Sequence, residues 1–472
     1  MLPQALEHPG QTGVVAIDDG RAAFGARVAL LRTAARSVDI QTFIWRADNA
    51  GTLLFEEVVR AAERGVRMRL LLDDLNTAGT DPTLALLASH ANIELRLYNP
   101  FVGRGSRAIG LLADFTRLNH RMHNKSFTVD NVVTLVGGRN IADEYYEIGE
   151  TGLVDLDIVA VGAVVQAVSN EFDLFWNSAS AYPARSLIAD VTPQTRDALA
   201  QRAQAIRAGS QATQYTDAVL RDNIVQGLAS GRIKFEWTLA DVVFDDPAKT
   251  LASGDHTELQ LLPKLHARLG EAFVSVDLIS PYFVPGEAGT ETLIGLTQRG
   301  VRVRVLTNSL SATDEKSVHA GYLKRREALL RAGVQLYELK RDASVIVQRA
   351  RDLGRGSKGR PAREDLHHRW PLHLRRLVQP RPALLAPEHR DGTADRQRCD
   401  RRPVVVRARS RVSSAGLPRD DARRRHDPVG RRRGHAVRHR PRNRLGRARD
   451  RAHRLVAADR VAVVALRCLA RP

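Results

Sequence analysis

The sequence predicts an α/β protein with two similar lobes, each built on a mixed, largely parallel sheet flanked by helices. Two observations carry this prediction. Strand-like apolar runs alternate with helix-like segments over most of residues 1–340, which is typical of sheets made from strand–helix–strand units. The pattern then occurs twice, with short matching strings separated by 235 to 241 residues.

The internal repeat is clearest around the expected strands. Ser37-Val-Asp-Ile matches Ser275-Val-Asp-Leu at an offset of 238 residues, and Arg64-Gly-Val-Arg-Met-Arg-Leu matches Arg299-Gly-Val-Arg-Val-Arg-Val at an offset of 235. Each copy has the order strand, helix, strand, helix, strand. The expected helices span 51–64 and 82–91 in the first copy and 287–298 and 314–332 in the second.

The repeat divides the chain into four parts. We expect a first lobe over residues 1–181, a connection of helices and loops over 182–250, and a truncated second lobe over 251–350. An Arg-rich tail occupies 351–472. The tail has too few large apolar residues to form a core, so we expect it to be disordered or poorly folded.

Charge separates the tail from the rest of the chain. The tail holds 34 Arg, one Lys and 12 acidic residues, a net charge of +23, whereas the first 350 residues have a net charge of −4. Both cysteines, Cys399 and Cys468, lie in the tail. The body therefore has no disulfide, thiolate metal site or Cys nucleophile. We see neither a signal peptide nor an uncharged apolar span of 18 residues, so we expect no transmembrane helix.

One motif carries the chemistry. The segment Arg121-Met-His-Asn-Lys-Ser-Phe-Thr-Val-Asp is followed six residues later by Gly137-Gly-Arg-Asn, giving H-x-K-x4-D-x6-G-G-x-N. Residues 122–128 and 132–136 are expected to be strands joined by a turn. Side chains two residues apart share one face of a strand, so His123 and Lys125 should meet the same phosphate.

These residue types are suited to phosphoryl-ester transfer without a metal or an organic cofactor. The imidazole of His123 can attack phosphorus or protonate a leaving oxygen near neutral pH. Lys125 and Asn140 would stabilise the charge of the transition state. Asp130, the acidic residue of the H-x-K-x4-D part of the motif, is expected to support the geometry of the site. The expected phosphate-binding backbone is Gly137, Gly138 and the start of a helix-like segment from Arg139.

The motif and several other segments together resemble the bacterial cardiolipin synthase branch of the phospholipase D superfamily. The resemblance extends over residues 8 to 340. The segments begin at His8, Ile40, Leu70, Arg121, Phe175 and Pro281. The resemblance implies two lobes with one H-x-K-x4-D motif each. One histidine would form a phosphohistidine, and the other would act as acid and then base. Asp155 would be the acid that orients the opposite histidine.

The resemblance also implies phospholipid substrates such as phosphatidylglycerol, a membrane surface as partner, and no specific nucleic acid. We expect a bacterial protein that is cytoplasmic or peripheral at the inner membrane.

The repeat predicts a second histidine near residue 364, but residues 361–370 contain no H-x-K. His367 and His368 are adjacent there, so they would point to opposite faces of a strand. Removing one base from codons that could encode 361–381 restores H-x-K-x4-D-x6-G-S-x-N. We therefore expect that the reading frame is lost between Lys340 and Pro361, and that the tail is an out-of-frame translation.

Two other functions remain open. A one-motif, nuclease-like phosphodiesterase could complete its site by dimerisation, with two copies of His123 facing one phosphate. Alternatively, the basic tail could bind nucleic acid or anionic lipid without catalysis. In the first and main interpretation, this chain holds half of a lipid-processing site and is inactive as a monomer.

Overall fold

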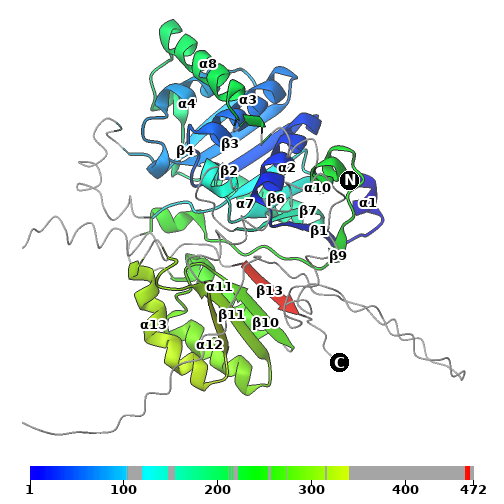
Figure 1. Cartoon of the computed structure of the whole chain (residues 1–472), viewed down its shortest axis with the longest axis vertical. Coiled ribbons are helices and arrows are strands. Elements are labelled where there is room, and N and C mark those ends of the chain that lie inside the picture. The colour runs from blue at the N-terminus through cyan, green and yellow to red at the C-terminus, as the bar shows by residue number, and fades with distance from the viewer. Residues whose placement is uncertain are drawn as a thin grey trace, which may run out of the picture.

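Figure 1 shows the structure, a computed structural model in which the two expected sheets are present. The residues described are 1–101, 104, 120–146, 155–210, 212–213, 215, 222–252, 257–272, 274–313, 316–339 and 463–467. His367, His368 and the expected out-of-frame tail lie outside the described residues, apart from 463–467.

The first sheet has nine strands in the order β8-β4-β3-β2-β5-β6-β7-β1-β9. Its strands are β1 Thr12–Ile17, β2 Ser37–Thr42, β3 Arg67–Asp73, β4 Ile93–Tyr98, β5 Ser126–Val129, β6 Val133–Gly137, β7 Asp157–Gly162, β8 Ala181–Pro183 and β9 Glu236–Thr238.

The expected mixed sheet is confirmed, but its parallel part is smaller than predicted. Only β2, β3 and β4 pair in parallel, and every other neighbouring pair of the first sheet is antiparallel. The repeat identified the strands that are joined to one another by a helix. Neighbouring strands that are joined in this way run parallel. The hairpin of β5 and β6 has a short turn, and such connections produce antiparallel pairs.

Helices cover both faces of this sheet. The expected helices at 51–64 and 82–91 are confirmed as α3 Asn49–Glu63 and α4 Asp81–Ala88. Asp48 caps α3 by accepting a hydrogen bond from the backbone nitrogen of Gly51, which satisfies a donor that the first turn leaves unpaired. The other helices are α1 Leu2–Leu6, α2 Gly20–Thr33, α7 Ala163–Trp176, α8 Pro193–Ala208 and α10 Asn223–Ala229, with short 3-10 turns η1 Asp74–Asn76, η3 Asp143–Tyr146, η4 Ala184–Ser186, η5 Pro247–Thr250 and η6 Thr257–Leu259.

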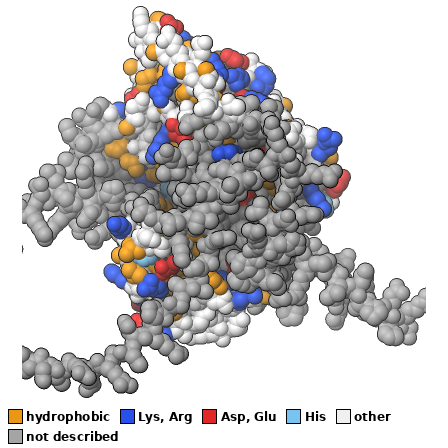
Figure 2. Space-filling view, viewed as in Figure 1, with side chains coloured by type: hydrophobic (Ala, Val, Ile, Leu, Met, Phe, Trp, Pro, Cys, Tyr) orange, Lys and Arg blue, Asp and Glu red, His pale blue; other side chains and the backbone are white. Residues whose placement is uncertain are grey.

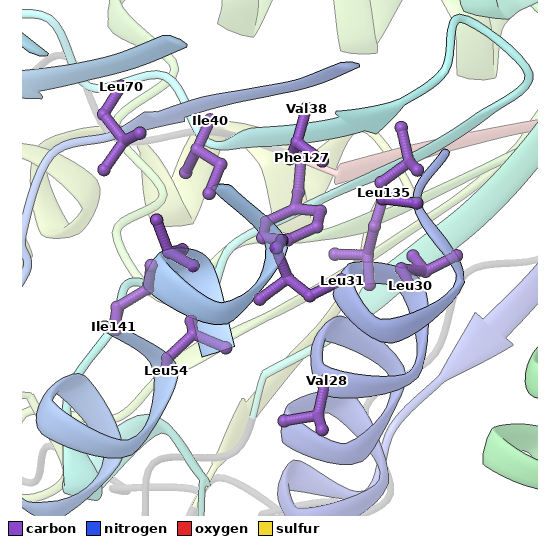
Figure 3. Packing of buried hydrophobic residues seen from close by; sticks show 14 of the residues in the cluster. Val28, Leu30, Leu31, Val38, Ile40, Leu54, Leu70, Phe127, Leu135 and Ile141 are labelled. Atoms are coloured by element: carbon purple, nitrogen blue, oxygen red, sulfur yellow. The ribbon is translucent and has the colours of Figure 1, made fainter. Parts of the chain in front are cut away.

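The strands bury side chains on both faces, in alternation. Leu70 and Leu72 join the large core formed with α2, α3 and α4, whereas Leu71 joins a smaller cluster with Phe172 and Phe175 of α7. Figure 3 shows the large core, in which Leu30 and Leu31 of α2 lie close to strand residues such as Phe127 and Leu135. Helix α7 therefore covers the face of the sheet opposite α2 and α3.

The expected connection over 182–250 also contributes to the first sheet. Strand β9 pairs with β1, and β8 pairs with β4. Helix α10 packs on α2, and α8 packs on α3 and α4. This segment is thus more than a link, because it contributes to both edge strands of the first sheet and adds two helices to the first lobe.

The second sheet has the order β12-β11-β10-β13, with the first three strands parallel. The expected helices at 287–298 and 314–332 are confirmed as α12 Gly286–Gln298 and α13 Lys316–Arg331. The other elements are α11 Leu261–Gly270, β10 Ser275–Ile279, β11 Arg302–Asn308, β12 Gln335–Leu339 and β13 Val463–Arg467.

The tail as a whole is expected to be disordered or poorly folded. Within it, the structure describes residues 463–467, which pair antiparallel with β10 as strand β13 (Figure 1). In the first lobe, β5 occupies the equivalent place, antiparallel to β2. The parallel strand β10 leaves one edge unpaired, and an apolar segment such as Val463–Arg467 can add backbone hydrogen bonds there.

The repeat extends to side-chain contacts. Arg69 forms a bidentate ion pair with Asp39, in which both hydrogen bonds are 2.7 Å long. Arg304 forms the same pair with Asp277 at 2.6 and 2.8 Å. Both pairs join neighbouring parallel strands at equivalent positions of the repeat. The two lobes therefore share a detailed architecture up to β12.

On the face drawn in Figure 2, Lys and Arg side chains of the described residues lie among Asp and Glu side chains. No helix in the described part of the chain has the length and hydropathy needed to cross a membrane.

Candidate active site

The motif lies where the chain enters β5. The extended segment ahead of this strand carries His123 and Lys125, so the strand is shorter than the predicted 122–128. Asp130 and Asn131 both have φ of 54° and form the hairpin turn, closed by a hydrogen bond from the backbone nitrogen of Val132 to the carbonyl of Val129. Two successive residues with positive φ match the right-handed twist of the hairpin strands.

His123 and Lys125 face each other. The Nζ of Lys125 lies 3.2 Å from Nδ1 of His123 and donates to the His123 carbonyl at 2.7 Å. Phe43 packs against the imidazole with ring centroids 4.7 Å apart, and Lys125 is only 9 % exposed. A largely buried ammonium beside an imidazole, against an aromatic wall, strengthens electrostatic interactions with a phosphate.

Asn140 fixes the backbone beside Phe43. Its Oδ1 accepts a hydrogen bond from the backbone nitrogen of Ile44 at 3.1 Å, and its Nδ2 donates to the hydroxyl of Tyr145 at 2.8 Å. The expected helix from Arg139 is absent, and the first helical turn is the 3-10 segment η3. Residue Arg139 is instead buried and donates to the carbonyl groups of four residues, Ile17, Asp18, Tyr145 and Asp155.

Asp130 holds the neighbouring strand in place. Its carboxylate accepts hydrogen bonds from the backbone nitrogens of Ala35, Arg36 and Ser37 at 2.7 to 2.9 Å. These donors lie just before and at the start of β2. Such an arrangement suits a supporting role, since a carboxylate with three backbone donors has few lone pairs left for chemistry.

The glycine pair makes room for two carboxylates. A β-carbon at Gly138 would collide with both carboxylate oxygens of Asp155, and one at Gly137 would collide with Asp157. We expected these glycines to admit the phosphate of a substrate. In the structure, the anion closest to Gly138 is the protein's own Asp155.

Asp155 is the site acid with a strongly perturbed environment. Burial raises its pKa to about 6, with the Arg139 charge opposing that rise and the Asp157 charge adding to it. The charge of Lys125 also acts on this carboxyl group and lowers its pKa. Asp155 thus lies within electrostatic reach of the motif and changes protonation near neutral pH.

We expect Gly138→Ala to lower stability by about 1–3 kcal/mol, the usual cost of overpacking. The new methyl group must displace Asp155 or the hairpin backbone. Thermal unfolding measures the effect. Gly295→Ala is the matched control, because a β-carbon there meets no atom within 4 Å and alanine favours the interior of helix α12. Equal melting temperatures for the two variants would show that Gly138 is not needed for space.

Two anchors of the motif were not singled out from the sequence. Asp73, at the end of β3, receives hydrogen bonds from Nε and Nη2 of Arg121 and from the backbone nitrogen of Met122. Glu171 of α7 accepts a hydrogen bond from Nδ2 of Asn124 at 2.6 Å. The position of Asp73 at the carboxyl end of a parallel strand was a usable signal. Nothing in the sequence marked Glu171.

Comparisons with known proteins place these features in a family. Residues 28–176 and 265–349 match the family model described as "Cardiolipin synthase, PLD-like domain". Cardiolipin synthase C of Escherichia coli (strain K12) is 43 % identical over 342 residues, which is 72 % of this chain and 72 % of that protein. The chain belongs to the phospholipase D-like family.

Two further proteins are less similar to this chain. An uncharacterized protein of Helicobacter pylori (strain 26695) is 31 % identical over 354 residues, covering 71 % of this chain and 67 % of that protein. A solved phosphatidylserine synthase of Haemophilus influenzae Rd KW20 has a TM-score of 0.45 and 16 % identity, covering 71 % of this chain and 76 % of that one. The family match ends at residue 349, before the position near 364 where the repeat predicts a second motif.

Proposed function

We propose that the protein carries half of the active site of a phosphatidyltransferase or phosphodiesterase of phospholipids, most like a cardiolipin synthase, whose first step forms a phosphohistidine at His123. The observation that carries this proposal is the approach of Lys125 Nζ to the His123 imidazole, within a chain of this family. A nucleophile and a cation at that separation can bind the two sides of one phosphodiester.

In the proposed first step, a ring nitrogen of His123 bonds to phosphorus while the bond from phosphorus to the leaving alcohol oxygen breaks. Lys125 stabilises the phosphoryl oxygens as negative charge builds up. The leaving oxygen must take a proton, and a hydroxyl of phosphatidylglycerol must lose one in the second step. One positioned acid–base group can serve both steps. Such a group typically accelerates a reaction by about 10²–10⁴-fold.

This chain lacks that group at the expected place. The second motif should lie near residue 364, where the sequence has no H-x-K. Asp155 is our candidate for the acid that orients the opposite histidine, supported by its position against Gly138 and the influence of Lys125 on its carboxyl group. The chain is thus expected to bind phospholipid but not to turn it over as a monomer.

We expect no cardiolipin from the full chain incubated with phosphatidylglycerol vesicles, measured by thin-layer chromatography against a His123→Ala background. Binding of short-chain phosphatidylglycerol should weaken by about tenfold or more in Lys125→Ala, because one charge-assisted hydrogen bond is lost. Turnover that depends on His123 would contradict the half-site. Binding that is insensitive to Lys125→Ala would contradict the assigned pocket, and cleavage of DNA alone would favour the nuclease-like alternative.

A further inference from the structure

A polar cluster lies behind the motif, on the face of the strand opposite His123 and Lys125. Glu171 Oε1 accepts hydrogen bonds from Asn124 Nδ2 at 2.6 Å and from Gln41 Nε2 at 3.2 Å. Ser126 Oγ donates to Gln41 Oε1 at 3.3 Å. Asn124 stands between the two motif residues, so this cluster holds the peptide segment that presents them.

Apolar side chains adjoin the polar cluster around Glu171. The side chain is 5 % exposed, and α7 also contributes Phe172, Phe175 and Trp176 to a buried cluster with Met122. Burial raises the pKa of Glu171 to about 7, and its bonds to Gln41 and Asn124 oppose that rise. A carboxyl group in such a layer costs free energy unless its hydrogen bonds compensate, so stability alone does not explain its presence.

The described part of the second lobe has the ion pair of the first lobe without this cluster. The Asp39–Arg69 pair recurs as Asp277–Arg304, but the position of Gln41 is taken by Ile279. Gln41 is paired in register with Ser126, whereas Ile279 is paired with Val463. Among the residues that the structure describes, the polar cluster is found only in the lobe that carries the H-x-K motif.

We propose that Glu171 is a positioning residue, which acts through Asn124 to fix the strand segment that aims His123 and Lys125 at the phosphate. The aim at a phosphate rests on the proposed function, while the fixing of the segment does not. Asn124 donates a hydrogen bond to the Glu171 carboxylate on helix α7, and Gln41 of β2 donates a hydrogen bond to the same carboxylate. Without the carboxylate, the buried amide of Gln41 and the partly buried amide of Asn124 lose their shared acceptor.

Hydrogen exchange of the backbone amides at residues 122–126 tests the positioning. We expect Glu171→Leu and Asn124→Ala each to speed exchange there by about tenfold, with little change in distant strands such as β11. Glu171→Gln should restore protection, because its Oε1 can still accept both hydrogen bonds. Gln166→Ala is the matched control, since it removes a side-chain hydrogen bond to Asn170 on the exposed face of the same helix.

Unchanged exchange at 122–126 in Asn124→Ala, with folding verified by circular dichroism, would overturn the proposal even if Glu171→Leu fails to fold. Loss of protection that Glu171→Gln does not restore would also overturn it. Binding of short-chain phosphatidylglycerol should weaken about fivefold in Asn124→Ala. If Lys125→Ala leaves lipid binding intact while Asn124→Ala exchanges faster, the proposed function fails and the positioning role stands.

Discussion

Arg121→Met is expected to lower the free energy of unfolding by about 3–5 kcal/mol, because it leaves a buried carboxylate without its cation. Arg121 and Asp73 are 2 % and 1 % exposed, and three hydrogen bonds join the guanidinium to this carboxylate at 2.8 to 3.2 Å. Methionine fills much of the volume but supplies no charge. Urea unfolding followed by circular dichroism measures the loss.

The acid dependence of this loss gives a second readout. Burial raises the pKa of Asp73, while Arg121 lowers it. Without Arg121, the carboxyl group should take up a proton more readily, so the loss should be smaller at pH 5 than at pH 8. Arg46→Ala, which breaks an exposed pair with Glu144, is the control and should cost about 0–1 kcal/mol. A similar cost for both variants would show that Asp73 does not depend on Arg121.

The elements that could be predicted from the sequence are those whose signal is local. Helices α3, α4, α12 and α13 follow from the period of their apolar residues and from the repeat, and their ends fall within about three residues of the prediction. The extent of parallel pairing could not be predicted as well. It depends on which strands become neighbours, and the antiparallel strands β5, β6 and β7 lie between the parallel set and β1.

The site shows the same division. His123 and Lys125 are two residues apart, so strand geometry alone predicts that they share a face, and they do. The partners of Asn124 and Arg121 come from α7 and β3, at separations of 47 and 48 residues. Such contacts depend on the packing of the sheet. Likewise, only the packing shows that Gly138 accommodates Asp155.

The two lobes separate what the fold needs from what the motif needs. The Asp39–Arg69 ion pair of the first lobe has an equivalent in the second lobe, so this contact belongs to the sheet that the two lobes share. In the described part of the chain, the second lobe has no counterpart of β6 or α7. Strand β13 fills the place of β5, but an equivalent edge strand alone does not bring a histidine and a lysine to that place.

Glu171→Gln is expected to stabilise the protein at pH 8 by about 3 kcal/mol relative to its effect at pH 4. Burial raises the pKa of Glu171 to about 7, against an ordinary value of 4.5. Between pH 4.5 and pH 7, Glu171 keeps a proton in the folded protein that it has released in the unfolded chain. Stability from this group is therefore present below pH 4.5 and lost as pH rises to 7. Glutamine has no such proton to lose.

The measurement is the difference in unfolding free energy between variant and parent protein, from pH 4 to pH 8. The difference is needed because Asp155, whose pKa is raised to about 6, contributes a slope of the same sign in both proteins. Glu94→Gln, on a side chain 54 % exposed, is the control and should stay within about 0.5 kcal/mol. A Glu171→Gln difference that does not grow between pH 4.5 and 7 would mean that this carboxylate is solvated as an ordinary surface group. Growth over that window would show that the buried charge of Glu171, beside the motif, lowers the stability of the protein.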